Sequence, residues 1–420
     1  MAKSSFQALP GTRDLQSPDT DRMRALVAIF AEEATAAGFG QVIPPMFEDV
    51  RVFDRLGEAS DVVSKELYAF EDKGGRQIAL RPEFTASVCR IFAEQRPMTP
   101  WKVWYSGPNF RYDKPQKGRY RQFDQVGAES IGTHDPDVDT ELIALANRFY
   151  ERIGLTKVTL LMNSLGDAGD RPRYLEALRA HFEANLDALS EQSRATLAVN
   201  PLRVLDSKRP GDAELIAAAP FLSDYLSDDA SVAFERVCAG LDALGVAYQL
   251  APRLVRGLDY YTRTTFEFAA DGLDAAQNAV GGGGRYDGLI ADLGGPEEPG
   301  VGFALGVDRT LLACDAEEAF AAPDSSMDVW VVSTTDGLEA LGITDELRRS
   351  DLRADRSFDG RSMRAQMKAA NRSDAGVAVI VGEDEAANDT VTIRPLRTEG
   401  DQITVPRSQL VTAVKEMLQS

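Results

Sequence analysis

The spacing of hydrophobic and polar positions predicts a helix and a strand near the beginning of the chain. Apolar residues recur with the helical period over residues 20–38, and Gly38 gives this helix a natural end. A short apolar run at 41–43 then predicts a strand, which the Pro44-Pro45 pair terminates.

An antiparallel hairpin is predicted next. Residues 101–112 and 122–132 are rich in aromatic and β-branched side chains, and they flank a polar, basic loop at 113–121. The pattern then predicts a helix at 136–153 and a strand at 157–162. The first part of the chain therefore mixes helices with strands.

The middle of the chain changes character twice. From about 168 to 245 the periodicity is helical with almost no strand pattern, which predicts a helical insertion. Strand patterns return at 263–269, and 301–314 is typical of a strand that runs into a helix. The glycine run at 281–284, taken alone, is most often a turn.

The end of the chain indicates a separate small domain. Residues 315–326 have the composition of a linker. Apolar runs at 329–333 and 377–381 predict short strands, and helical segments at 336–350 and 360–375 lie between them. This alternation predicts a small α/β domain.

Composition limits the classes of protein that fit. No apolar run reaches the roughly 20 residues of a membrane span, and the start of the chain lacks a secretory pattern, so we expect a cytoplasmic protein with no membrane contact. Three cysteines without a CxxC pair and only two histidines make disulfides, a zinc site and a catalytic triad unexpected. The net charge of −20 argues against a nucleic-acid partner. The basic residues gather in a few segments, however, and the local electrostatic potential around them determines whether a nucleic acid can bind there.

The basic hairpin loop carries the most informative chemical pattern. Arg111 closes the first strand, Arg119 lies in the loop, and Arg121 opens the return strand. Several guanidinium groups around one point are suited to a polyanion such as a nucleoside triphosphate. A solvated hairpin tip would have the same pattern.

Three further segments carry weaker patterns. Arg253–Arg263 combines arginines with Tyr260 and Tyr261, whose hydroxyls can bind a polar substrate. The glycine run before Arg285 removes side chains where a backbone approaches a ligand. Gly302–Arg309 places an arginine at a helix start, where it can stack on a purine or hold a phosphate. Each segment also has a purely structural interpretation. The first could be a basic edge of the core, the second a turn and the third a packing contact.

Together, the order and spacing of these segments resemble histidyl-tRNA synthetase, a class II aminoacyl-tRNA synthetase, over almost the whole chain. Phe110–Gln125 resembles the second class II motif, Gly302–Arg309 resembles the third, and Pro45 lies where the first motif contributes to the family's dimer interface. Four more blocks resemble the histidine enzyme: Leu80–Thr85, Asn200–Lys208, Leu254–Tyr261 and Gly282–Leu289. The chain departs from the usual family pattern at Phe84, Tyr112–Lys114 and Asp308.

The resemblance implies roles for individual residues. Arg111 would bind the α-phosphate of ATP, and Arg256 would reach the histidine carboxylate and the α-phosphate, which makes both catalytic. Arg119 and Arg309 would bind the outer phosphates or the adenine. The implied histidine-binding residues are Glu83, Thr85 and Gln125 for the amino group, Glu129 and Tyr261 for the imidazole nitrogens, and also Tyr260 and Arg256. Mg²⁺ would accompany ATP, and no residue is assigned as a metal ligand.

The implied fold is α/β (α+β): an antiparallel-sheet catalytic core with a helical insertion, followed by a C-terminal α/β anticodon-binding domain. The implied boundaries are 1–167 and 246–315 for the two parts of the core, 168–245 for the insertion, 316–327 for the linker and 328–420 for the anticodon-binding domain. Seven basic residues would face the tRNA backbone: Arg348, Arg349, Arg353, Arg356, Arg361, Arg364 and Lys368.

The implied activity is ATP-dependent activation of L-histidine to histidyl-adenylate and its transfer to the 3′ end of tRNA(His), with release of AMP and diphosphate, by a homodimer. The alternative is a histidine-sensing regulatory subunit of ATP phosphoribosyltransferase, which keeps the fold but charges no tRNA. Such subunits typically lack the C-terminal module and carry a degraded Arg256 block, whereas both features are present here. A class II enzyme for threonine or proline is a third possibility, which the block at Leu254–Tyr261 contradicts.

Overall fold

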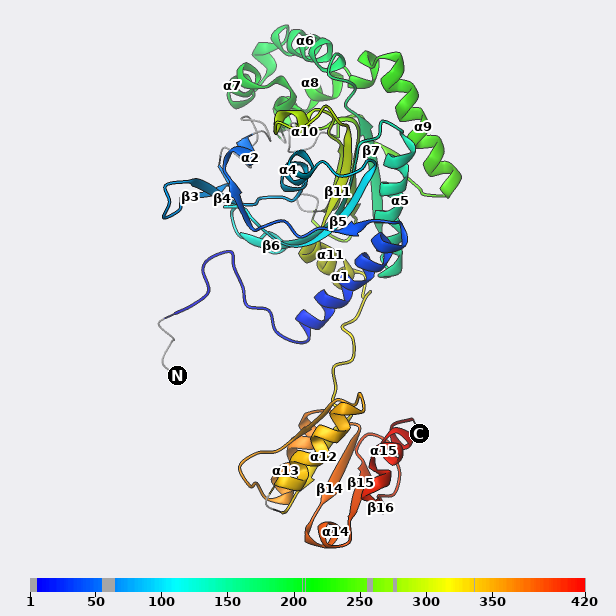
Figure 1. Cartoon of the computed structure of the whole chain (residues 1–420). Helices are drawn as coiled ribbons and strands as arrows, with labels where there is room; N and C mark the ends of the chain where they lie inside the picture. Colours follow the sequence, from blue (N-terminus) through cyan, green and yellow to red (C-terminus); the bar gives the residue numbers. More distant parts are fainter. Residues whose placement is uncertain are drawn as a thin grey trace. The chain divides into compact units, whose positions relative to one another are not determined.

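The computed structural model describes residues 6–54, 65–205, 207, 209–254, 260–274, 278–335 and 337–419. The chain divides into two compact units, Met1–Ala322 and Pro323–Ser420. Figure 1 shows the helices and strands of each unit.

An eight-stranded sheet organises the larger unit. Its order is β1 (Gly40–Gln41), β5 (Trp101–Phe110), β6 (Gln122–Ile131), β11 (Gly300–Gly306), β10 (Ala279–Arg285), β9 (Thr262–Ala270), β7 (Val158–Ser164) and β8 (Gln249–Leu250). The six central strands pair antiparallel, and only the short edge strands β1 and β8 pair parallel with their neighbours. The predicted hairpin is confirmed, because β5 pairs with β6 from Trp101↔Ile131 to Phe110↔Gln122.

Helices cover both faces of this sheet, because the side chains of a strand alternate between two buried sides. On one face lie α1 (Asp19–Ala36), α5 (Asp137–Arg152) and α11 (Val307–Ala316), with Phe30 packed edge-on against Phe149 and Phe303. On the other face lie α4 (Thr85–Gln95) and α10 (Leu289–Asp292), around Tyr105 and Phe92. The predicted helices near residues 20–38 and 136–153 are thereby confirmed.

The elements described between β7 and β8 are all helices, as the periodicity predicts. They include α6 (Asp170–Glu183), α7 (Glu191–Val199), α8 (Ala213–Ala218) and α9 (Asp228–Leu244). Ser227 begins α9 by accepting a hydrogen bond from the Ala230 amide, which satisfies an otherwise unpaired helix N–H. Tyr174, Leu178 and Phe182 form part of a separate hydrophobic cluster, so the insertion has a core of its own.

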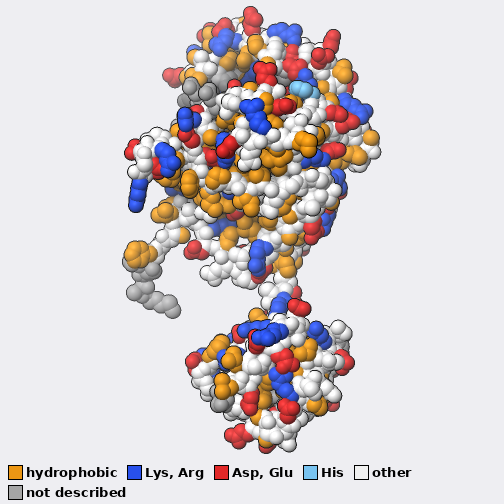
Figure 2. Space-filling model, in the orientation of Figure 1, with side chains coloured by type: hydrophobic (Ala, Val, Ile, Leu, Met, Phe, Trp, Pro, Cys, Tyr) orange, Lys and Arg blue, Asp and Glu red, His pale blue; other side chains and the backbone are white. Residues whose placement is uncertain are grey.

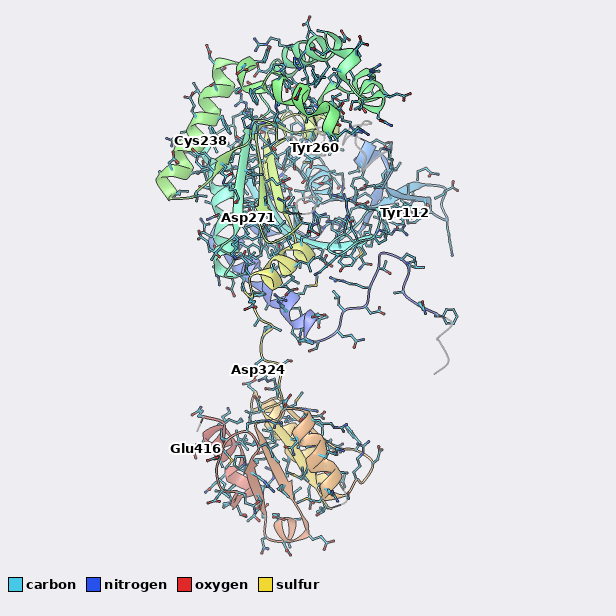
Figure 3. The ribbon with its side chains drawn as sticks, turned by 180° about the vertical axis from the view of Figure 1, so that it is seen from behind. Tyr112, Cys238, Tyr260, Asp271, Asp324 and Glu416 are labelled. Carbon is cyan, nitrogen blue, oxygen red and sulfur yellow. The ribbon has the colours of Figure 1, made fainter. Side chains whose placement is uncertain are left out.

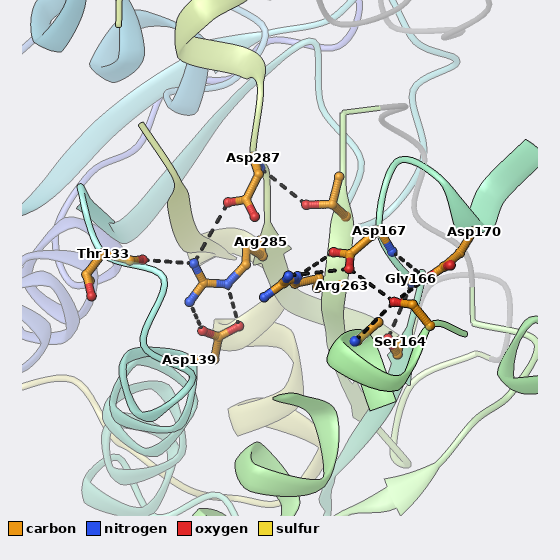
Figure 4. A network of polar contacts seen from close by, with 12 residues as sticks. Thr133, Asp139, Ser164, Gly166, Asp167, Asp170, Arg263, Arg285 and Asp287 are labelled. Carbon is orange, nitrogen blue, oxygen red and sulfur yellow. Dashed lines mark hydrogen bonds and ion pairs between the residues drawn. The ribbon is translucent and has the colours of Figure 1, made fainter. Parts of the chain in front are cut away.

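Two ion pairs link β10 and β9 to neighbouring segments of the larger unit (Figure 4). The buried guanidinium of Arg285 pairs with Asp139 and donates to the carbonyl of Thr133 at 2.9 Å. Arg263 pairs with Asp167, a residue that follows β7. These contacts join segments that are far apart in the sequence.

The glycine run is a strand, and its prediction as a turn is wrong. Gly281–Gly284 lie inside β10, between β9 and β11. A Cβ at Gly283 would lie 2.0 Å from the carbonyl oxygen of Gly302, so the neighbouring strand leaves no room for a side chain. Close strand packing therefore explains Gly281, Gly283 and Gly284, and neither a turn nor a positive φ requires the run.

A small sheet that the pattern did not predict lies beside α4. Its order is β2 (Phe47–Asp49), β4 (Gln77–Leu80) and β3 (Tyr68–Glu71), and the short α2 (Arg51–Asp54) follows β2. Its strands are three or four residues long, too short to give a clear alternation of apolar and polar positions.

The second unit is an α/β domain built on a five-stranded sheet. The strand order is β13 (Ala354–Arg356), β12 (Val329–Ser333), β14 (Val377–Val381), β15 (Thr390–Pro395) and β16 (Ile403–Pro406). The helices are α12 (Leu338–Arg349), α13 (Met363–Arg372), α14 (Glu383–Ala387) and α15 (Leu410–Gln419). The predicted fold class is confirmed. Within the described ranges, none of the helices combines the length and the apolar character that crossing a bilayer demands.

Candidate active site

A cavity of about 210 Å³ opens beside the central strands of the large sheet. Its wall is formed by residues of β6, β10, β11, α11, the hairpin loop and the segment before β9. Glu83, just before α4, and Thr85, the first residue of α4, complete it. In Figure 3, Tyr260 lies at the end of the large sheet that is nearer the helical insertion. The predicted site residues that line the cavity are Glu83, Thr85, Arg111, Arg119, Gln125, Tyr260, Tyr261 and Arg309.

Three guanidinium groups share this cavity. The Nε of Arg111 donates to the carbonyl of Pro82 at 2.9 Å, and Arg309 donates to the carbonyls of Gly118 and Ala279 at 3.1 and 2.9 Å. Burial lowers the pKa of Arg309, and the nearby charges of Arg119 and Arg111 lower it further. Each cation therefore raises the free energy of the others, and an anionic ligand would relieve that repulsion.

An acidic group lies at the beginning of α4. The carboxylate of Glu83 accepts hydrogen bonds from the amides of Thr85 and Ala86 at 2.6 and 2.8 Å, which fixes it at the positive end of the helix. Burial raises the pKa of Glu83, and these amides, with the charge of Arg111, act in the opposite direction. A carboxylate fixed in this way can accept further hydrogen bonds from an ammonium group.

Polar and aromatic groups complete the wall. The side-chain amide of Asn109 donates to Oε1 of Gln125 at 2.6 Å across the β5–β6 pair, so Gln125 is held by a residue that the sequence pattern did not identify. Tyr260 and Tyr261 pack with their ring centroids 4.6 Å apart. Burial raises the pKa of Tyr260 far above its usual range, so its hydroxyl stays protonated and can donate a hydrogen bond.

Glu129 lies behind the cavity wall rather than in it. Its carboxylate is fully buried and accepts hydrogen bonds from three hydroxyls: Thr85 at 2.7 Å, Tyr105 at 2.9 Å and Tyr286 at 2.8 Å. Burial raises the pKa of Glu129 to about 8, although each of these hydrogen bonds lowers it. Thr85 connects this carboxylate to the cavity, because it lines the cavity and donates to Glu129.

Three aspartates in the cavity wall, Asp113, Asp124 and Asp308, were not predicted as site residues, and Asp113 forms an ion pair with Arg119. Asp308, singled out in the sequence only as a departure from the family pattern, accepts a hydrogen bond from the amide of Asp124 at 3.2 Å. Burial raises the pKa of Asp124 to about 6, and the charge of Asp308 adds to that rise. The cavity wall therefore carries the neighbouring carboxylates of Asp124 and Asp308, together with those of Asp113 and Glu83, beside its three arginines.

Arg256 belongs to residues 255–259, which lie outside the described part of the chain. The other three predicted arginines, Arg111, Arg119 and Arg309, lie around one cavity.

In the second unit, several of the predicted tRNA-facing arginines are paired with aspartates. These pairs are Arg348–Asp355, Arg349–Asp345, Arg353–Asp328 and Arg361–Asp359.

Comparison with known proteins gives matches over nearly the whole chain. Residues 11–310 match the family described as histidyl-tRNA synthetase, and residues 328–417 match the anticodon binding domain. The chain is 48% identical to a histidine–tRNA ligase of Corynebacterium kroppenstedtii, covering 98% of this chain and 97% of that one. It is 45% identical to a histidine–tRNA ligase of Rhodococcus erythropolis, covering 99% of both chains.

A solved structure supports the same family assignment. The apo histidyl-tRNA synthetase of S. aureus superposes with a TM-score of 0.83 at 34% identity, covering 98% of this chain and 100% of that chain.

Proposed function

The chain belongs to the histidyl-tRNA synthetase family and is a histidine–tRNA ligase, and on that premise we propose how its cavity activates histidine. The reaction joins the carboxylate of L-histidine to the α-phosphorus of ATP. One carboxylate oxygen forms the new P–O bond, the bond to the β-phosphate oxygen breaks, and diphosphate leaves with the electron pair. The 3′-terminal ribose of tRNA(His) then takes the histidyl group, and AMP is released.

The convergence of Arg111, Arg119 and Arg309 on one cavity carries the proposal. Attack of a carboxylate on a phosphate brings negative groups together, so fixed cations that follow the developing charge lower the barrier without a protein nucleophile. In our assignment Arg111 binds the α-phosphate, and Arg119 and Arg309 bind the outer phosphates or the adenine. Arg256 is assigned to the histidine carboxylate and the α-phosphate by the family pattern of its sequence block alone.

Histidine is assigned to the end of the cavity near α4. Glu83, Thr85 and Gln125 would accept hydrogen bonds from the amino group, and the helix terminus that holds Glu83 keeps its carboxylate in place. Tyr260 and Tyr261 would enclose the imidazole, with Tyr261 bonded to one ring nitrogen. Glu129 would accept from the other ring nitrogen, which requires a ligand that reaches past Thr85 to its carboxylate.

Magnesium would accompany ATP. Among the described residues no cluster of three or more His, Cys, Asp or Glu could hold a metal ion by itself. Asp124 and Asp308 nevertheless fit Mg²⁺, which usually takes one or two carboxylates together with phosphate oxygens and water. When bound, the ion would neutralise phosphate charge.

A homodimer is part of the proposal. Ile43, Met46 and Phe47 flank the two prolines of the first motif and are 79%, 50% and 57% exposed. Figure 2 shows hydrophobic side chains gathered on the larger unit. Exposed apolar side chains of this kind are typical of an interface, and a second copy of this chain is the partner that the motif predicts. Analytical ultracentrifugation would report the association.

The C-terminal unit would bind the anticodon stem, in keeping with its match to the anticodon binding domain. Arg364 and Lys368 on α13 are candidates for backbone contacts. A cytoplasmic location is also proposed, since the tRNA substrate is used there.

Two assays test the proposed function. Exchange of labelled diphosphate into ATP should depend on histidine, and tRNA(His) should then be charged. Histidine binding with neither exchange nor charging would indicate a sensor protein and would overturn the proposal.

A further inference from the structure

The described segment before α1 reaches the rim of the cavity. Leu9–Thr12 form a turn in which the amide of Thr12 donates to the carbonyl of Leu9 at 2.9 Å. Pro10 and Gly11 take its central positions, and Gly11 has a φ of +84°, as the third position of a type II turn requires. The sequence Pro-Gly therefore determines the shape of this segment.

The turn docks on the basic hairpin. The carbonyl of Gly11 accepts a hydrogen bond from the backbone amide of Arg121 at 2.7 Å. A Cβ at Gly11 would lie 2.6 Å from the Cγ of Arg121, so the close approach also requires glycine. Arg121 ends the loop that carries Arg119, so the segment contacts the part of the hairpin that borders the cavity.

Arg13 follows the turn and contacts two residues of the cavity wall. Its Nη1 donates to the hydroxyl of Tyr120 at 2.8 Å, and its guanidinium carbon lies 4.1 Å from the centre of the Tyr120 ring. Its Nη2 forms an ion pair with the carboxylate of Asp308, whose side chain is only 11% exposed. Tyr120 and Asp308 come from the hairpin loop and from α11, so Arg13 joins two separate elements.

The charges at this end of the cavity explain why a cation is useful there. Asp308 and Asp124 lie side by side, and the cavity is assigned to a polyanion. Without a cation beside them, whether Mg²⁺ or a fixed guanidinium group, two carboxylates would repel phosphate groups. Arg13 offsets the charge of Asp308 and fixes its side chain. Asp308 immediately precedes Arg309 in the chain.

We propose that Arg13 is a positioning residue of the nucleotide end of the cavity. By holding the Tyr120 ring and the Asp308 carboxylate, it makes the N-terminal segment part of the ATP-binding structure. The histidine end is expected to be independent of Arg13, because the hydroxyls that hold Glu129 belong to Thr85, Tyr105 and Tyr286. The identity of the ligand as ATP rests on the proposed function.

Equilibrium binding measured by calorimetry, with ATP and with histidine separately, tests this inference. Arg13→Ala should weaken ATP binding about tenfold, the scale of one charge-assisted hydrogen bond, and should change histidine binding less than twofold. Arg13→Lys keeps the charge and should recover part of the ATP affinity. Gly11→Ala should weaken ATP binding in the same direction, since it displaces the turn that aims Arg13.

Arg24→Ala is the matched control, because Arg24 is exposed on α1 and pairs with Asp21 one helical turn away. Unchanged ATP affinity in folded Arg13→Ala, or equal losses for ATP and histidine, would overturn the inference. A wild-type protein that binds ATP but shows no histidine-dependent exchange would overturn the proposed function alone. A wild-type protein that binds no ATP would overturn both.

Discussion

The phenolic hydroxyl of Tyr105 lies 2.9 Å from Oε1 of Glu129, on adjacent strands of the large sheet. Thr85 donates to the same oxygen, and Tyr286 donates to Oε2. A carboxylate offers about four acceptor positions, two on each oxygen. Three are therefore occupied by protein hydroxyls, and the one that is left, on Oε2, suits a single ring N–H.

Glu129→Gln should selectively weaken histidine recognition. At about pH 8.5, above the pKa of the carboxyl, the substitution replaces a charged acceptor by a neutral amide of the same shape. Loss of a hydrogen bond to a charged group corresponds to roughly a ten- to hundredfold higher KM for histidine. Steady-state exchange kinetics with varied histidine and varied ATP measure this, and the KM for ATP should stay within a fewfold.

Glu94→Gln, an exposed change on α4, provides the control. If Glu129→Gln raises both KM values equally, Glu129 has no special role in binding the ring.

The raised pKa of Glu129 also predicts how stability changes with pH. Because the folded pKa of about 8 lies above the ordinary value of 4.5, the folded protein holds more protons than the unfolded chain between these pH values. The contribution of Glu129 to stability therefore falls as the pH rises from about 4.5 to 8. Glu129→Gln removes this dependence, so its Tm should exceed that of the wild type by more at pH 8 than at pH 5. Thermal melts without ligands across this range measure the difference, and parallel curves would contradict the assignment.

Gly302→Ala should disrupt the same carboxylate. A Cβ at Gly302 would lie 1.5 Å from Oε2 of Glu129, a distance that forces the side chain to move. Overpacking of this kind costs about 1–3 kcal/mol, and histidine affinity should fall with it. Gly306 on the same strand is the matched control for stability, since the nearest atom to its Cβ would be 3.6 Å away. Melting temperatures and histidine calorimetry, measured on the Gly302→Ala and Gly306→Ala variants, distinguish the two positions. If Gly302→Ala keeps the Tm and the histidine affinity of the wild type, the prediction is wrong.

The sequence predicts the family, the fold class and most of the strands and helices correctly, because the long elements have clear periodicity. The glycine run is the instructive failure. Local propensity favours a turn, but β11 approaches β10 so closely at Gly283 that only glycine fits there. Such an approach depends on residues from another strand and leaves no pattern within the run itself.

The candidate site divides in the same way. Arg111, Arg119 and Arg309 belong to recognisable motifs, so they were identified from the sequence and lie around one cavity. Asn109 and Arg13 act through partners that are 16 and 107 residues away, and neither belongs to a motif that indicates its role. Their functions follow only from the folded arrangement.

Arg256→Ala tests the assignment that rests on sequence alone. The substitution should abolish measurable adenylate formation, a loss of roughly a hundredfold or more, because one electrostatic donor to the transition state is removed. Histidine binding should weaken only modestly. Arg253→Ala, immediately before this block, is a control, since that guanidinium stacks over Phe221 of the insertion. Wild-type exchange rates in Arg256→Ala would remove its catalytic role.

The buried pair of Arg285 and Asp139 predicts a stability effect that is separate from catalysis. Both side chains are at most 2% exposed, and Arg285 also donates to the carbonyls of Thr133 and Asp135. Arg285→Met would leave a buried carboxylate without its cation, at a cost of roughly 3–5 kcal/mol. Urea unfolding followed by tryptophan fluorescence measures this loss.

The double variant Arg285→Met/Asp139→Leu distinguishes a lost ion pair from lost packing. Removal of both charges should restore part of the stability, because an apolar pair of similar volume can replace a buried ion pair. The recovery should be incomplete, since two carbonyls still lack their donor. Arg236→Met, a change on α9, breaks an exposed pair with Asp137, which lies on α5 as Asp139 does, and should cost no more than about 1 kcal/mol. If Arg285→Met costs no more than this control, the buried pair does not stabilise the contact between β10 and α5.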